Sequence, residues 1–492
     1  MNTIEVRRLQ AIASKAKQMF RDDYNRVRWF SEAEAAKATE ERNKLLHLLN
    51  PALSADGDEA NGMKPHIGPI SPGCRICQHG GWDCTWINTH CTRRCFFCSY
   101  THDPSKCRNH APRCKLGNFL NAQDHVEYIK MFDIKGVGFS GGEPLLQLNV
   151  LLKHIEAIRS EFGSTIHIWI YTNGDLVDKH TLWKLKNAGL NEIRFNIAAR
   201  EYDLRPLALA RQYIPILTVE TPAIPDDLYI MKQKMKKLEA LGVDHLNLHQ
   251  LRTSQYNYRV FRKCNYTFIS NIWHAPIHQS EMCCLKLMRF AVEENIAIPI
   301  NYCSKIYKDT FQTRNNRVRL GSLFLKPFEE LTEVGLIRKI ELTAPQEVIA
   351  KYESRLKRDG ADLNKWYSSP DQCRINIHSD LLRYGDVPSM GFRVLYIDAS
   401  KGRKKDVRQR FSKKGMKIDY RLIHRSKILS PHAIKAWSQL YIDKQDKKRV
   451  FDEYHKALLV DAGSLHAMTI EEDELRGMAL YEEIQCGLPD VC

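Results

Sequence analysis

The most regular feature of the sequence is an alternation of short apolar runs with longer segments of helical periodicity, from about residue 80 to residue 302. Short runs rich in β-branched and aromatic residues are typical of buried parallel strands. Such runs are TWINT (85–89), GVGFS (136–140), IHIWIYT (166–172), EIRFNI (192–197), IPILTVE (214–220), HLNLHQL (245–251) and IAIPINY (296–302). Six or seven β/α units with right-handed crossovers predict an α/β fold, a partial barrel of the (β/α)6 type. Its ligand groups should gather at the carboxyl ends of the strands.

The pattern changes on both sides of this region, which predicts three parts. Residues 1–60 form a charged helical extension that runs into the linker SADGDEANG (54–62). Residues 61–330 form the barrel with a cysteine-rich entry segment. Residues 331–492 combine a helix-like stretch (351–360), a strand-like stretch (392–398) and an amphipathic stretch (446–460), which predict a basic α+β accessory domain.

Charge and composition narrow the class of protein. The 492 residues are 43% hydrophobic, and no apolar run reaches the ~18–20 residues of a membrane span. The N-terminus lacks the apolar core of a signal peptide, so we expect a cytoplasmic protein with no membrane partner. Residues 401–430 carry twelve Lys or Arg and two Asp within a chain of net charge +16. Such a stretch is either a solvated face or a surface for RNA or an acidic peptide.

The fifteen cysteines are concentrated in one region, with eight of them between Cys74 and Cys114. Cytosolic thiols are kept reduced, so this distribution indicates a metal region and not a disulfide framework. CTRRCFFCSY (91–100) places Cys91, Cys95 and Cys98 in the loop after the first strand. Structural zinc needs four protein ligands, whereas a cubane held by three thiolates keeps one iron open. The spacing therefore favours an open iron–sulfur cluster.

A second motif ends the next strand. FSGGEP (139–144) contains a glycine pair, Gly141 and Gly142, followed by Glu143. Glycines let a ligand approach the backbone closely, and a glutamate accepts hydrogen bonds from an ammonium group. One β/α unit after the cysteine triplet, this turn predicts a binding site for an amino-group ligand.

With these two motifs, residues 70–320 resemble the radical S-adenosylmethionine (SAM) superfamily, in its pyruvate formate-lyase activating enzyme-like branch. The resemblance implies a [4Fe–4S] cluster on Cys91, Cys95 and Cys98, with SAM on the open iron. It implies SAM contacts from Phe97, Gly141, Gly142, Glu143, Thr172, Asn173, Asn196 and Glu220. For Asn196 and Glu220, a purely structural role as polar strand ends stays open.

The resemblance also implies an activity. An electron from a flavodoxin- or ferredoxin-type donor enters the cluster, SAM is cleaved to a 5′-deoxyadenosyl radical, and the radical removes hydrogen from a substrate. The segment before the barrel is short for a cobalamin domain, and the C-terminal part has few cysteines for a two-cluster extension. We expect a small-molecule or peptide substrate, with RNA bound by the basic domain as the alternative. A non-catalytic iron–sulfur or zinc protein that binds nucleic acid is a further alternative, which the GGEP turn disfavours.

Closer still is the resemblance to a poorly characterised subgroup with an upstream GCxxC element and a YCS segment after the last strand. Here these are GCRIC (73–77) and NYCSKIYKDTFQTRNNR (301–317). Cys74, Cys77 and Cys303 are then candidates for a second iron–sulfur cluster, a zinc site, a redox pair or plain thiols. Candidates for a fourth ligand are Cys84, Cys107, Cys114, Cys283 and Cys284.

Overall fold

The computed structural model describes residues 28–54, 64–100, 112–114, 118–254, 256–268, 275–308, 312–384, 387–399, 407–413, 416–442, 478 and 481–482. The expected helical pattern in 1–27, the amphipathic stretch 446–460, Cys107 and most side chains of the basic stretch 401–430 lie outside this description. The chain divides into two compact units, the first ending at Thr313 and the second spanning Arg314–Gln485. None of the helices described is both long enough and apolar enough to cross a membrane.

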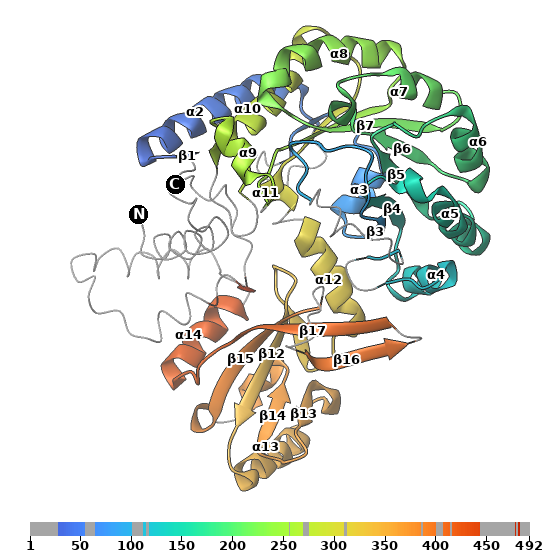
Figure 1. Cartoon of the computed structure of the whole chain (residues 1–492). Helices are drawn as coiled ribbons and strands as arrows, with labels where there is room; N and C mark the ends of the chain where they lie inside the picture. Colours follow the sequence, from blue (N-terminus) through green and yellow to red (C-terminus); the bar gives the residue numbers. More distant parts are fainter. Residues whose placement is uncertain are drawn as a thin grey trace. The chain divides into compact units, whose positions relative to one another are not determined.

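The first unit is built on the predicted parallel sheet (Figure 1). Its strands are β2 (His66–Ile67), β3 (Trp82–Asn88), β4 (Gly136–Gly141), β5 (His167–Thr172), β6 (Glu192–Phe195), β7 (Ile216–Pro222), β8 (His245–His249) and β10 (Ile300–Cys303). Strands β3 to β8 follow chain order and β10 adds to β8, all in parallel, while β2 pairs antiparallel with β10. The expected α/β fold of the partial-barrel type is confirmed.

Helices cover the outer face of this sheet. They are α4 (Ala122–Met131), α5 (Leu148–Phe162), α6 (Lys179–Ala188), α7 (Arg205–Ala210), α8 (Leu228–Ala240) and α10 (His278–Glu293). Two short helices, α9 (Tyr258–Lys263) and α11 (Lys305–Tyr307), come after β8 and β10 along the chain. Helix α6 ends at a glycine: Gly189 has φ +92°, a left-handed conformation that favours this residue.

Glycines of β4 and a tryptophan of the neighbouring strand β5 shape the inner face. Phe139 contacts the rings of His125 on α4 and His154 on α5, so it faces the outer helices. Strand alternation then turns Gly138 inward. A Cβ on Gly138 would lie 2.6 Å from the buried indole of Trp169 on β5. The glycines of GVGFS therefore make room for this ring.

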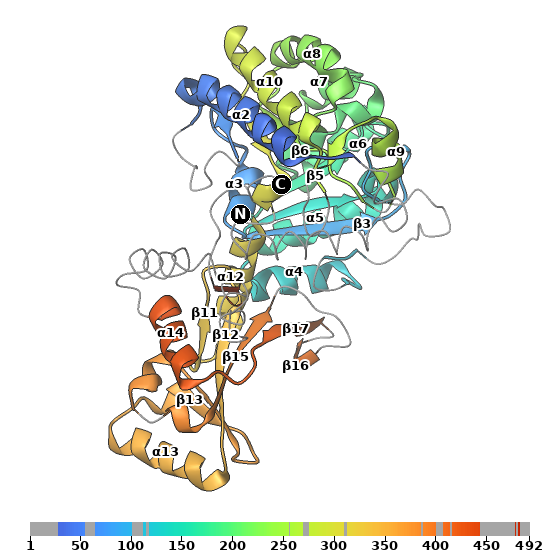
Figure 2. The ribbon, with the colours of Figure 1, turned by 90° about the vertical axis from the view of Figure 1, so that its left-hand side faces the viewer.

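The helical extension packs on the barrel through α2 (Glu32–Leu49), which lies beside α10 in both ribbon views (Figure 2). A buried ion pair joins the two helices, with Arg42 Nε 2.7 Å from Glu281 Oε1. The short strand β1 (Arg28–Trp29) pairs in parallel with β9 (Thr267–Phe268). The segment before the linker is thus an integral part of the first unit.

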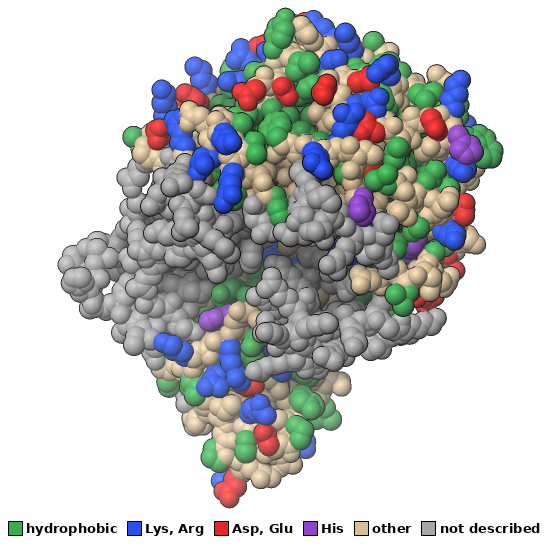
Figure 3. All heavy atoms as spheres, viewed as in Figure 1, with side chains coloured by type: hydrophobic (Ala, Val, Ile, Leu, Met, Phe, Trp, Pro, Cys, Tyr) green, Lys and Arg blue, Asp and Glu red, His purple; other side chains and the backbone are tan. Residues whose placement is uncertain are grey.

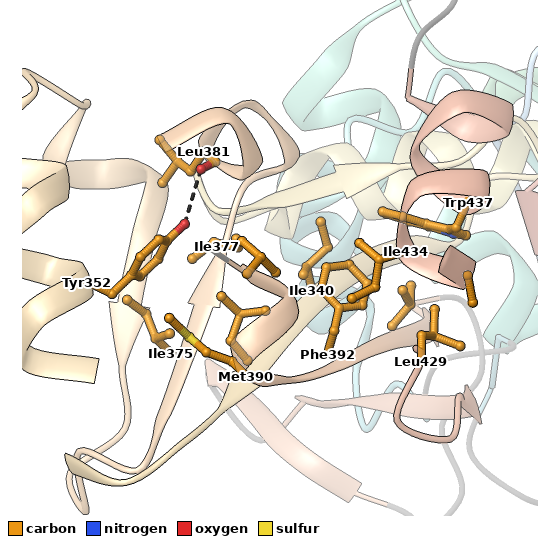
Figure 4. Packing of buried hydrophobic residues seen from close by; sticks show 14 of the residues in the cluster. Ile340, Tyr352, Ile375, Ile377, Leu381, Met390, Phe392, Leu429, Ile434 and Trp437 are labelled. Carbon is orange, nitrogen blue, oxygen red and sulfur yellow. Dashed lines mark hydrogen bonds between the residues drawn. The ribbon is translucent and has the colours of Figure 1, made fainter. Parts of the chain in front are cut away.

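The second unit is an antiparallel sheet with helices, as expected for an α+β domain. Its strands are β11 (Glu329–Leu331), β12 (Ile337–Thr343), β13 (Trp366–Ser368), β14 (Arg374–Ile377), β15 (Gly391–Asp398), β16 (Val407–Lys413) and β17 (Met416–Arg425). Its helices are α12 (Thr313–Phe324), α13 (Gln346–Arg358) and α14 (Pro431–Tyr441). The core packs Phe392 edge-on against Trp437, and the buried Tyr352 hydroxyl donates to Leu381 O at 3.1 Å (Figure 4).

Candidate active site

The three clustered cysteines lie in the loop that follows β3, at the carboxyl edge of the sheet. Cys98 N donates to Cys95 O at 3.0 Å, which closes a tight turn between two of them. Burial and repulsion from the neighbouring Cys98 and Cys91 raise the pKa of the Cys95 thiol to about 12. The three sulfurs belong to one short loop. Deprotonating all three needs a compensating positive charge, which a bound metal centre provides.

An arginine within the triplet fastens this loop to the end of β5. Arg93 donates from Nε and Nη2 to the carboxylate of Asp175, both at 2.7 Å. Thr92 donates to the same carboxylate at 2.8 Å. Asn173 donates to Thr92 Oγ1 at 2.8 Å and lies 3.6 Å from the Cys91 sulfur. The turn after β5 thus orders the first half of the cysteine loop.

The GGEP turn packs against the other side of the loop. Gly142 N donates to Asn88 O at 3.0 Å, and Glu143 N donates to His90 O at 2.7 Å. A Cβ on Gly142 would lie 1.9 Å from His90 O, and one on Gly141 (φ +130°) would lie 2.2 Å from Asn88 O. Both glycines are therefore required by the close approach of two backbone segments, which holds the turn beside the cysteines.

Glu143 is fully buried between β4 and β5. Its carboxylate accepts hydrogen bonds from Leu145 N at 3.1 Å, Thr172 Oγ1 at 3.0 Å and Asn173 N at 2.9 Å. Burial nevertheless raises its pKa to about 7, against the effect of these donors. A carboxylate has about four acceptor positions, so one remains for a cationic ligand. An ammonium group there would favour the charged form.

The other predicted SAM contacts are distributed over two places. Phe97 packs against a buried apolar cluster that includes Ile224 and Leu251, which follow β7 and β8, and its carbonyl accepts from Asn257 Nδ2 at 3.1 Å. Asn196 caps a short 3-10 helix after β6, accepting from Ala199 N at 3.3 Å. This is the structural role that the sequence left open for Asn196.

Glu220 points to the inner face of the barrel and is held by protein partners. Its carboxylate lies 2.7 Å from Arg194 Nη1 and 2.9 Å from His249 Nε2. Although burial opposes it, His249 and Arg194 hold the pKa of Glu220 well below its usual range. Sequence reasoning missed Arg194, because an arginine inside an apolar strand carries no spacing signal. It missed Asp175 as well, although this residue directly follows YTNG.

The remaining cysteines of the sequence analysis lie in several environments. Cys74 and Cys77 sit on a short helix, α3 (Pro72–Gln78), and Cys303 ends β10. Cys283 and Cys284 are buried in α10, and the thiol of Cys283 donates to Ile224 O at 3.6 Å.

The donor set of the β3 loop fits an iron–sulfur cluster better than a single ion. A structural zinc ion takes four protein ligands, whereas this loop supplies three cysteines. A cubane can be held by three thiolates, which keeps one iron open. Three neighbouring thiols with a buried acceptor on the adjacent turn therefore suit a cluster and an amino-group ligand bound side by side.

Comparison with known proteins gives consistent matches. The sequence pattern of the Radical SAM superfamily matches residues 87–208. Over 290 residues the chain is 30% identical to a putative glycyl-radical enzyme activating enzyme of Methanocaldococcus jannaschii, covering 56% of this chain and 74% of that protein. A GTP 3′,8-cyclase of Corynebacterium glutamicum is 35% identical over 75 residues, 15% of this chain and 19% of that protein.

The matches to solved structures cover about half or less of the length of those chains. The radical S-adenosylmethionine methyltransferase TsrM of Kitasatospora setae matches with a TM-score of 0.28 and 15% identity, over 40% of this chain and 43% of that one. SuiB of Streptococcus suis, bound to its precursor peptide SuiA, matches with a TM-score of 0.28 and 12% identity, over 44% and 51%.

Proposed function

The chain belongs to the radical SAM superfamily, in the branch related to pyruvate formate-lyase activating enzyme, and we propose that it removes a hydrogen atom from a small-molecule or peptide substrate. It is a radical SAM enzyme, and its cofactors are a [4Fe–4S] cluster and SAM. The observation that carries the proposal is the packing of the GGEP turn against the cysteine loop. There Glu143 N donates to His90 O, one residue before the triplet.

In this proposal the residues of the loop and the turn have separate tasks. Cys91, Cys95 and Cys98 hold the cluster, and Glu143 accepts a hydrogen bond from the amino group of SAM. Asn173 links these tasks, because its backbone N–H binds Glu143 and its side chain lies beside Cys91. When bound, the cluster and SAM supply the one-electron cleavage of SAM and the group that accepts the hydrogen atom.

Further side chains complete the SAM site in this proposal. Thr172 fixes the Glu143 carboxylate, and Phe97 offers its ring as an apolar wall for the adenine. A flavodoxin- or ferredoxin-type protein is the proposed electron donor.

The substrate class rests on the relatives and on the charge of the molecule. The M. jannaschii relative is described as an activating enzyme for a glycyl-radical enzyme, which favours a peptide or protein substrate over RNA. On the face shown in Figure 3, acidic and basic side chains are interspersed over the described parts of the first unit. RNA is the second candidate because of the charge of residues 401–430. Membership of the superfamily argues against a non-catalytic nucleic-acid-binding protein.

Isotope transfer tests the proposed substrate class. Cells that encode the chain are grown in deuterium oxide, and their extract is separated into low-mass, protein and total tRNA fractions. Each fraction is incubated anaerobically with the enzyme, unlabelled SAM and dithionite, and 5′-deoxyadenosine is examined by mass spectrometry. We expect deuterium from the low-mass or protein fraction. Label that comes only from tRNA would replace the proposal with RNA modification.

A further inference from the structure

A second group of cysteines lies on the inner face of the barrel, where helix α3 contacts β3, β4 and β5 (Figure 1). Gly73 is what lets α3 come so close, since a Cβ there would lie 2.3 Å from Arg194 Nη2. Arg194 in turn donates to Ser71 Oγ at 3.0 Å, at the start of the helix. Together these contacts place Cys74, the residue after Gly73, against the middle of β6 and β8.

The sulfur of Cys74 is surrounded by nitrogen donors. Asn247 Nδ2 lies at 3.2 Å, Arg194 Nη1 at 3.6 Å and Asn301 Nδ2 at 3.9 Å. Cys74 and the two asparagines are buried. A neutral thiol is only a weak acceptor, so three nitrogen donors around one sulfur suit a thiolate or a metal-bound sulfur.

Two further sulfurs belong to the same group. Cys77 lies one helical turn after Cys74 and accepts a hydrogen bond from Gln312 Nε2. Cys303 ends β10 opposite His249 of β8, two residues after Asn301. Strand alternation turns Cys303 to the same face as Asn301, whose side chain lies beside Cys74. The GCxxC and YCS elements, more than 200 residues apart in sequence, therefore supply one set of three thiols.

A cation lies beside the segment that follows Cys303. Lys64 is only 5% exposed, and its Nζ lies 4.6 Å from the ring centroid of Tyr307. A largely buried ammonium group is favoured by a nearby negative charge. The Oδ1 atom of Asn301, buried and without a partner, points to an incomplete site as well.

We propose that Cys74, Cys77 and Cys303 hold a second iron–sulfur cluster inside the barrel, separate from that of the β3 loop. Three thiols are one short of the four protein ligands of a structural zinc site, which favours a cluster over zinc. Asn247, Arg194, Asn301 and Gln312 stabilise its sulfurs by N–H···S hydrogen bonds, and Lys64 offsets its negative charge. The site is independent of SAM cleavage, so it can be tested whether or not that activity is found.

Iron analysis of two complementary variants tests the site. The first, Cys91→Ala/Cys95→Ala/Cys98→Ala, is reconstituted anaerobically with iron and sulfide. We expect it to keep about two to four irons per chain, the content of one binuclear or cubane cluster, with sulfur-to-iron charge-transfer absorption. The second, Cys74→Ala/Cys77→Ala/Cys303→Ala, should fall to about four irons, the content of the loop cluster alone. Cys264→Ala, at an exposed cysteine of the same unit, should leave the wild-type content unchanged.

Circular dichroism shows whether each variant is folded. If one of them fails to fold, the iron content of the other is sufficient to test the site. The proposal is overturned if the loop variant is folded but holds no iron, or if the interior variant keeps the wild-type content. Zinc at one ion per chain in the loop variant would overturn it in favour of a mononuclear site. A Cys74–Cys77 disulfide in the anaerobically reconstituted protein, shown by mass spectrometry, would overturn it in favour of a redox pair.

Discussion

Asp175 receives both hydrogen bonds of the Arg93 guanidinium, each at 2.7 Å, and so ties the interior of the cysteine triplet to the end of β5. The hydrogen bonds from Arg93 lower the pKa of Asp175, which keeps the pair charged at neutral pH. Two parallel hydrogen bonds fix orientation as well as distance. The β3 loop is thus ordered by a residue that is not a metal ligand.

Replacing Asp175→Asn should loosen this loop without removing a ligand. A partly exposed pair contributes about 1 kcal/mol, so we expect the cluster to be lost to a chelator about fivefold faster. Asp133→Asn is the control, because Asp133 pairs with Lys135 before β4 and not with the residues around Asp175. The rate of iron release to the chelator is measured for both variants and for the wild type. Equal rates for Asp175→Asn and wild type would show that the pair does not order the loop.

The Glu143→Gln substitution should weaken SAM binding and leave the iron content unchanged. The amide keeps the shape of the side chain but cannot balance the charge of an ammonium group. We expect a loss of about tenfold or more in SAM affinity, the effect of one hydrogen bond to a charged group. Calorimetric titration measures it, with Glu156→Gln on the exposed side of α5 as control. Loss of iron from Glu143→Gln would place this residue at the cluster and not at SAM.

The pH dependence of SAM binding follows from the same carboxylate. Its pKa is raised to about 7 by burial, so in the free enzyme it is protonated below that pH and charged above it. Its contribution to the free energy of unfolding is therefore largest below the unfolded pKa of 4.5 and is lost as pH rises through about 7. The pH dependence of SAM affinity has the opposite sign, because the ammonium group of SAM binds the charged form of Glu143.

We therefore expect SAM affinity to fall as pH is lowered through about 7, approaching tenfold per pH unit. Dissociation constants of wild type and Glu143→Gln are compared between about pH 6 and 8. Glu143→Gln should lack this pH dependence of SAM affinity, which distinguishes the ionisation of Glu143 from ionisations of SAM itself. The same slope in both proteins would remove Glu143 as its source.

Gly142→Ala should disturb the contact between the GGEP turn and the cysteine loop. The new Cβ would lie 1.9 Å from His90 O, which cannot move away as a flexible side chain can. Overpacking of this kind costs about 1–3 kcal/mol in the free energy of unfolding. Gly81→Ala is the control, since its Cβ would meet side chains at ordinary contact distances, Lys135 at 3.4 Å and Ile76 at 3.8 Å. Urea unfolding of the two variants with equal midpoints would contradict this packing.

The sequence was sufficient for the parallel strands because each is a continuous buried run bounded by turns. Even the C-cap of α6 could be assigned, since Gly189 follows the last apolar residue of the helical pattern. The same reasoning located the cysteine loop and the GGEP turn at one edge, because parallel strands end on the same side. These are properties of local sequence and chain order.

What the sequence could not supply are partnerships between distant residues. The contacts of Glu220 join β7 to Arg194 on β6 and His249 on β8, and no spacing rule connects these positions. Likewise, the sequence predicts the strand GVGFS but not that Trp169 fills the space beside its glycines. The position of α3 on the inner face depends on Gly73 meeting Arg194, a contact 121 residues apart.

The central claim is that the β3 loop and the GGEP turn together make this chain a SAM-cleaving enzyme. The most direct measurement is 5′-deoxyadenosine formed by the anaerobically reconstituted wild type with SAM and dithionite. The variant Cys91→Ala/Cys95→Ala/Cys98→Ala serves as the comparison. We predict 5′-deoxyadenosine from the wild type and none above background from the variant. Equal amounts from both proteins, or none from a wild type with its full iron content, would contradict the claim.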